Sequence, residues 1–185
     1  MKKLLVALCL AIFISTPIFA QNDDPRNAFS VIVNFNFPTG AFGDFWGNGL
    51  GLVAEYERLI TNEFSAGASI GYLFWMPETE PLSAEIRFSD IPIQLFIKYY
   101  FPSTGNFTPY FIIEGGLHNT ASTTTYGEYS HSDDGEDLGL APGFGVLMPV
   151  GSGVMVNACA KYTTIFTEDN NTTHFGFNAG VTIPF

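Results

Sequence analysis

The sequence predicts an all-β fold, a single eight-stranded antiparallel up-and-down transmembrane β-barrel that follows a cleaved signal peptide. Three observations support this prediction. Apolar and polar residues alternate with a period of two along eight segments, as expected for β-strands with two different faces. The connections between these segments alternate between short and long, which is typical of membrane barrels. One face of the segments is rich in glycine and serine, which suits the narrow interior of a small barrel.

The first twenty residues have the features of a secretory signal peptide. Lys2 and Lys3 precede an apolar run over residues 4–14, and Ala20 offers a small residue at a cleavage point. The run is too short to cross about 30 Å of hydrocarbon as an anchoring helix. The expected organisation is therefore a signal peptide over 1–20, a short N-terminal segment over 21–26 and a barrel domain over 27–185.

The charge balance disfavours a nucleic-acid partner, and we expect none. The chain has 7 basic and 18 acidic residues and a net charge of −11. Loss of Lys2 and Lys3 with the signal peptide leaves too few basic residues to assemble a basic patch. Cys159 would then be the single cysteine, so the mature chain cannot form an internal disulfide.

The eight segments follow one another from residue 27 to the end of the sequence. The third is the clearest, because Phe64, Ile70 and Tyr72 lie on one face while Gly67 and Ser69 lie on the other. The expected strands span residues 27–37, 49–60, 63–75, 90–101, 109–119, 137–149, 153–166 and 172–185. The expected long connections are 38–48, 76–89 and 120–136; the short ones are 61–62, 102–108 and 150–152, and 167–171 is intermediate.

Alternation alone does not say which face points outward. A soluble periplasmic, lipocalin-like barrel would direct its apolar face inward, whereas a membrane barrel directs that face to lipid. Small residues on the polar face, aromatic residues near the strand ends and a closed sheet without free edges all favour the membrane barrel. We therefore expect the apolar side chains to contact outer-membrane lipid.

Several stretches in order along the chain carry a family resemblance. They are "NFNFPTGAFGDFWGNGLGLVAEYE", "TPYFIIEGGL", "LGLAPGFGVLMPV" and the final strand, preceded by the signal peptide. With these features the chain resembles the small outer-membrane β-barrel proteins of Gram-negative bacteria, the porin-like family with an OmpA/OmpX-type eight-stranded barrel. The resemblance implies the bacterial outer membrane as the location, reached through the periplasm, and insertion by the barrel-assembly machinery.

The resemblance also implies an assembly signal in the final strand. In such families this signal consists of a polar residue, a glycine two positions later, and hydrophobic residues three and five positions beyond the glycine. Asn178, Gly180, Ile183 and Phe185 match this form. Two features depart from it: Ile183 stands where an aromatic residue is commoner, and Pro184 removes a backbone donor beside the end of the strand.

Five charged residues fall on the face predicted to line the lumen. Because buried charges must be paired, we hypothesise a network that fills the barrel and blocks the flow of water. An alternative interpretation leaves some of these side chains unpaired at a wet rim. The residues concerned are Glu55, Glu57, Lys98, Glu114 and Lys161.

An acidic segment, "TTTYGEYSHSDDGED", suggests a divalent-cation site. Its candidate ligands are His131, Asp133, Asp134, Glu136 and Asp137. Their spacing fits no Ca²⁺-loop pattern, and an acidic outer loop is ordinarily just solvated. We therefore predict no metal site and no cofactor.

The sequence does not predict catalysis. Its three histidines are His118, His131 and His174, and neither the His131–Ser132 pair nor His118 near Ser122 has a recognisable orienting acid at a useful spacing. The expected role is therefore structural, adhesive or loop-mediated, with an unknown extracellular ligand. The alternative role is a narrow porin-like channel or pocket for small solutes.

Overall fold

The computed structural model describes residues 26–77, 85–103, 105–127, 129–151, 153–167 and 171–185. The expected signal peptide over 1–20 lies outside the described residues. Among the described residues, no helix has the length and apolar character needed to cross a membrane.

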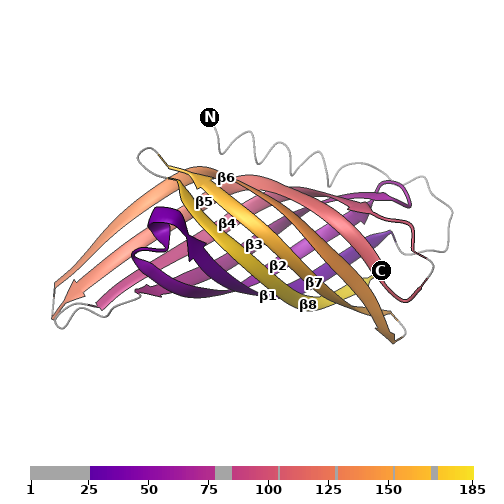
Figure 1. Cartoon of the computed structure of the whole chain (residues 1–185), viewed down its shortest axis with the longest axis horizontal. Coiled ribbons are helices and arrows are strands. Elements are labelled where there is room, and N and C mark those ends of the chain that lie inside the picture. Colours follow the sequence, from indigo (N-terminus) through magenta and orange to yellow (C-terminus); the bar gives the residue numbers. More distant parts are fainter. Residues whose placement is uncertain (1–25, 78–84, 104, 128, 152, 168–170) are drawn as a thin grey trace.

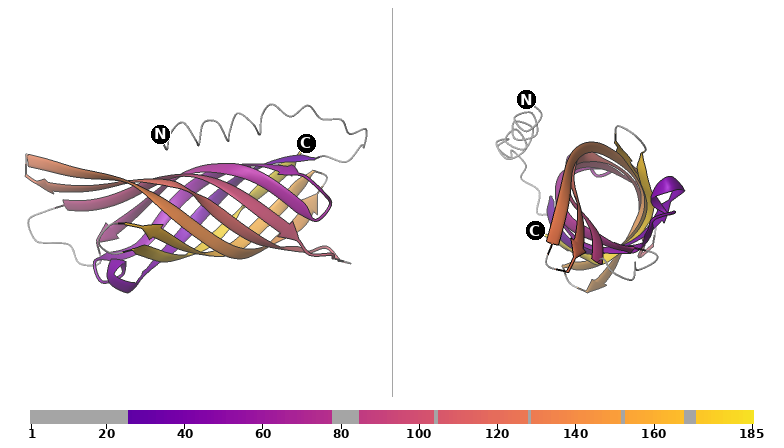
Figure 2. Two further views of the ribbon diagram at one scale, coloured as in Figure 1. Left: turned by 90° about the horizontal axis from the view of Figure 1, so that it is seen from above. Right: turned by 90° about the vertical axis from the view of Figure 1, so that its left-hand side faces the viewer.

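Eight antiparallel strands in chain order form one closed barrel, in which β1 pairs with both β2 and β8 (Figure 1). Seen along the axis, the ribbon is a closed ring (Figure 2). This architecture confirms the predicted fold class. The elements are β1 (Asn27–Thr39), η1 (Gly40–Phe42), β2 (Trp46–Leu59), β3 (Phe64–Pro77), β4 (Glu85–Tyr100), β5 (Thr108–Tyr126), β6 (Tyr129–Gly151), β7 (Val154–Phe166) and β8 (Thr172–Pro184).

The seam between β1 and β8 closes the barrel. Its register runs from Ala28 opposite Pro184 to Thr39 opposite Thr173. Beyond β8, Asn27 and Phe185 exchange two backbone hydrogen bonds, with N–O distances of 3.1 and 2.8 Å. Pro184 therefore interrupts the ladder without ending it, and the seam continues to Phe185.

The apolar face points outward. On β1, Phe29 is 44 % exposed and Phe37 is 42 % exposed, whereas Asn34 and Asn36 are buried in the lumen. The other strands repeat this arrangement, with large apolar side chains outside and most of the buried polar groups inside. A soluble barrel requires the opposite orientation, so the lipocalin-like alternative does not fit.

The segment over 120–136, expected to be a long loop, is instead a β-hairpin. The β5–β6 ladder continues from Thr120 opposite Gly135 to Tyr126 opposite Tyr129, and it projects beyond the rest of the barrel (Figure 1). The extension is polar on both faces, so it has no alternation for a sequence pattern to detect. Its run of threonines nevertheless favours extended backbone. Likewise β2 begins at Trp46 and β4 at Glu85, earlier than expected.

Glycines on the lumen face make room for large side chains from neighbouring strands. A Cβ atom on Gly145 would lie 2.3 Å from Cζ of Tyr110, and one on Gly67 would lie 2.3 Å from Cζ of Phe96. Both rings therefore lie flat across the glycine of the adjacent strand. The glycine-rich polar face consequently belongs to a filled interior rather than to an open pore.

Candidate functional site

The five charged residues expected in the lumen lie there and contact one another. Lys98 Nζ on β4 donates to Glu55 Oε2 at 3.1 Å and to Glu57 Oε2 at 2.7 Å on β2. Lys161 Nζ on β7 donates to Glu114 Oε1 on β5 at 2.8 Å and lies 3.7 Å from Glu55 Oε1. Glu55 thus joins the two lysines in one cluster, which we call the lumen ion cluster.

Lys98 has the most confined position in this cluster. Its side chain is only 1 % exposed, and Nζ lies 4.6 Å from the centre of the Phe96 ring and 5.3 Å from that of Tyr110. The hydroxyl of Tyr100 donates to Glu57, so this carboxylate has a second partner. Such partners are needed because removing each charge from water costs roughly several kcal/mol of hydration free energy.

An apolar layer packs inside the lumen on the side of the chain ends and short turns, which we call the terminal end. Tyr100 and Tyr110 pack edge to face with ring centres 5.7 Å apart, and Tyr110 Oη donates to Asn157 Oδ1 at 2.6 Å. The buried members of this layer are Phe96, Tyr100, Tyr110, Ile112, Leu147 and Cys159.

An aromatic layer packs inside the lumen at the opposite end, which we call the hairpin end. Phe42 of η1 folds against it, with ring centres 5.6 Å from Trp75 and 5.3 Å from Phe88. The ring of Trp46 lies 5.3 Å from that of Phe88. The lumen therefore has an aromatic layer at the hairpin end, charged and polar groups in the middle, and an apolar layer towards the terminal end that also encloses Lys98 and contacts Glu57.

The polar middle of the lumen contains a pair that the sequence interpretation missed. His118 Nδ1 lies 2.6 Å from Asp90 Oδ2, and its Nε2 lies 3.3 Å from Gln94 Nε2. Both ring nitrogens of His118 are thus engaged by neighbouring side chains rather than by Ser122. Asp90 lies an even number of positions from Gln94 and Lys98 on β4, so all three side chains lie on the same face of the strand. This spacing is the sequence signal that could have predicted that Asp90 points into the lumen.

The candidate metal ligands lie along the exposed β5–β6 hairpin. There Asp133 and Asp134 are consecutive on an extended strand, so their side chains point to opposite faces. No group of three or more His, Cys, Asp or Glu side chains within the described ranges is placed to hold a metal ion, these five residues included.

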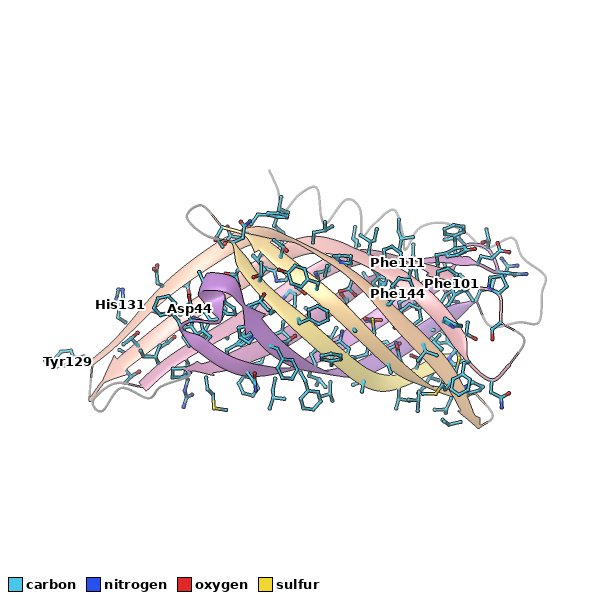
Figure 3. All side chains as sticks on the ribbon, viewed as in Figure 1. Asp44, Phe101, Phe111, Tyr129, His131 and Phe144 are labelled. Carbon is cyan, nitrogen blue, oxygen red and sulfur yellow. The ribbon has the colours of Figure 1, made fainter. Side chains whose placement is uncertain are left out.

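Outward aromatic residues gather near the terminal end. Phe144 lies with its ring centre 5.9 Å from that of Phe101 and 5.3 Å from that of Phe111. Figure 3 shows these three residues near one end of the molecule, with Tyr129 and His131 at the other. Such clusters are typical of the aromatic girdles at a membrane interface.

The four residues of the expected assembly signal are divided between the two faces of β8. Asn178 is buried in the lumen, and a Cβ on Gly180 would lie 2.3 Å from the backbone oxygen of Val31. Ile183 and Phe185 are exposed on the outer face, at 49 % and 61 %.

The model of the family "Outer membrane protein beta-barrel domain" matches residues 6–185. The chain belongs to this family. Membership places this outer-membrane barrel in the bacterial outer membrane, where its apolar outer face contacts lipid. A comparison with curated proteins gives no significant match.

Solved structures with the same fold include those of three bacterial proteins. Neisserial surface protein A is 16 % identical, with 86 % of this chain and 97 % of that chain covered and a TM-score of 0.63. Ail, the attachment invasion locus protein of Yersinia pestis, is 13 % identical, with 88 % and 99 % covered and a TM-score of 0.63. OprG from Pseudomonas aeruginosa is 13 % identical, with 89 % and 98 % covered and a TM-score of 0.56. Ail has also been crystallised with the heparin analogue sucrose octasulfate. At these identities the likeness concerns the fold alone.

Proposed function

We propose that this outer-membrane barrel is a closed, non-catalytic interaction protein that binds an extracellular partner through its β5–β6 hairpin. The orientation follows from the short turns and chain ends, which share one end of the barrel. In outer-membrane barrels the short turns are periplasmic and the longer connections extracellular. The projecting hairpin then extends away from the cell (Figure 1).

The filled lumen supports an interaction role over the alternative of a narrow channel or solute pocket. A hydrated solute entering from outside would meet the aromatic layer of Phe42, Trp75 and Phe88, and then the lumen ion cluster. Planar-bilayer recordings of the purified barrel are therefore expected to remain silent. Stable, solute-selective conductance would contradict a closed lumen and support the channel.

The single observation that carries the proposal is the open edge of the hairpin. Among the described strands, β6 pairs with β7 only as far as Leu138 opposite Phe166, whereas it pairs with β5 out to Tyr129. Residues 129–135 of β6 therefore present one edge to solvent. An extended peptide can add to such an edge through main-chain hydrogen bonds.

The charge of the hairpin indicates the chemistry of the partner. Asp133 and Asp134 place a negative charge on each face of the open strand, and Asp137 follows at its base. An extended segment rich in lysine or arginine complements this surface. A sulfated polyanion of the kind crystallised with Ail would be repelled by it.

The proposal is tested by titrating the barrel in lipid vesicles with an extended Lys/Val peptide. D133N/D134N is expected to weaken binding roughly fivefold, because each exposed charge pair contributes up to about 1 kcal/mol. D44N is the matched control, since Asp44 is an acidic residue at the same end but outside the hairpin (Figure 3). It is expected to leave the affinity unchanged.

A version of the same peptide with every backbone amide N-methylated separates strand addition from charge attraction. It keeps every charge but cannot form the ladder, so it is expected to lose binding. Equal binding of both peptides would rule out strand addition. Preferential binding of sucrose octasulfate over the basic peptide would overturn the proposed partner class.

A second part of the proposal concerns the end of β8. Asn178, Gly180, Ile183 and Phe185 are proposed to be read by the barrel-assembly machinery during insertion. Deletion of Phe185 is expected to lower the amount of folded barrel in cells severalfold, whereas the loss of its two backbone hydrogen bonds to Asn27 is expected to lower the melting temperature of barrel refolded in detergent by only a few °C. Phe107→Ala, in the β4–β5 turn, is the control for loss of an exposed aromatic residue. Equal cellular yields for the deletion and the control would contradict a signal role.

A further inference from the structure

A small cavity lies in the polar middle of the lumen, between the lumen ion cluster and the aromatic layer. Its volume is about 20 Å³. Its wall comes mainly from β1, β4, β5, β7 and β8, and it includes Asn34, Asn36, Gln94, His118, His174 and Asn178. None of these residues belongs to the hairpin on which the proposed function rests.

Four buried polar atoms in this wall have no hydrogen-bond partner among the described residues. They are Asn34 Oδ1, Asn36 Nδ2, His174 Nδ1 and Asn178 Oδ1. The four side chains are at most 8 % exposed, so bulk water does not hydrate them. A buried polar group without a partner destabilises the fold, so these four atoms need a partner within the cavity.

Gly176 creates part of the space at this point. A Cβ atom built on it would lie 3.0 Å from Asn36 Oδ1 and 3.6 Å from Asn178 Oδ1. Any side chain here would therefore occupy the volume next to these amides. The glycine leaves that volume to a guest that can bond with the surrounding polar atoms.

We infer that this cavity is a binding site for an ordered water molecule. A polar cavity of about 10–15 Å³ holds one water, provided that two to four polar partners surround it. Water can donate to two acceptors and accept from two donors. Asn34 Oδ1 and Asn178 Oδ1 are acceptors, Asn36 Nδ2 is a donor, and His174 Nδ1 is a donor when it carries the proton.

The charges around the cavity favour a neutral guest. Lys161 and Glu114 both line it, but each is the other's partner at 2.8 Å. A cation would be repelled by the Lys161 ammonium, and an anion by the Glu114 carboxylate. A water molecule satisfies the amides without disturbing this ion pair.

The inference is tested by crystal structures of the barrel at a resolution that shows ordered water. The expected result is one density peak within hydrogen-bond distance of at least three of the four atoms. Crystals soaked in rubidium bromide are expected to show no anomalous peak there. An anomalous peak would show that the cavity binds an ion, which would contradict the inference of a water site. The absence of any density would also overturn the inference.

A pair of glycine variants checks that the cavity holds the water. Gly176→Ala places a methyl group in the cavity and is expected to remove the peak. Gly115→Ala is the control, because its Cβ would meet only ordinary contacts, 3.6 Å from the backbone oxygen of Gly139 and 3.8 Å from Leu140. It is expected to retain the peak. Persistence of the same peak in Gly176→Ala would contradict the inference, and the wild-type structure tests it even if that variant does not fold.

Discussion

Lys98→Met is expected to lower the free energy of unfolding of this outer-membrane barrel by about 3–5 kcal/mol, because it leaves buried carboxylates without their counter-charge. Lys98 Nζ contacts both Glu55 Oε2 and Glu57 Oε2, and all three side chains are buried. Methionine has a similar length, so loss of packing contributes little. Urea unfolding in detergent micelles, followed by the fluorescence of Trp46 and Trp75, measures the change.

The matched control removes one charge of each sign. In K98M/E57Q the net charge of the lumen ion cluster stays the same, and the amide oxygen of the new glutamine can still accept from Tyr100. This variant is expected to recover more than half of the lost stability, since replacing a whole buried pair is often nearly neutral. If Lys98→Met alone is as stable as the wild type, the cluster does not stabilise the barrel.

Val33→Arg is expected to cost about 2–4 kcal/mol, the effect of a cation near the middle of the hydrocarbon on the outer face of a barrel. Val33 is the central residue of β1, it is 42 % exposed, and it pairs with Leu52 and Ala179. The cost arises because the guanidinium must lie in lipid or distort the bilayer around it. Unfolding in lipid vesicles measures this effect.

Ile60→Arg makes the same chemical change at the edge of the bilayer. Ile60 is 55 % exposed and lies in the β2–β3 turn at the terminal end. Near the interface a cation costs only about 0–1 kcal/mol. Equal costs at Val33 and Ile60 would mean that the outer face of β1 is not in contact with hydrocarbon.

The number of strands and the orientation of their faces could be predicted from the sequence because lipid imposes a strict alternation. Phe35 beside Asn36, or Ile97 beside Lys98, indicates a strand with one apolar and one polar face, and the small residues on the polar face indicate that this face lines the lumen. The hairpin beyond Thr120 could not be predicted in this way, because both of its faces meet water. The early start of β4 was missed for a related reason, since its first residues are not part of a regular alternation.

The lumen-facing charges could likewise be selected from the sequence by parity alone, but their pairing could not. Lys98 and Glu57 lie on β4 and β2, which are not neighbours in the barrel. They meet because the intervening strand β3 presents Ser65 and Gly67 to the lumen there, and these residues are too small to separate them. Asp90 and His118 lie diagonally across β4 and β5, two register positions apart. Such contacts depend on shear and side-chain size together, which a strand pattern does not contain.

The seam at β1 and β8 has a consequence for the time course of folding. Ser30 and Thr182, which are 152 positions apart along the chain, hydrogen-bond across it. Closing so long a loop is slow relative to forming the hairpins, because the entropy of the intervening chain is lost before the contact is made. Until that moment β1 and β8 are both open edges, exposed to pairing with another copy. Fast delivery to the membrane, rather than a more stable final barrel, is therefore what would protect this protein from aggregation.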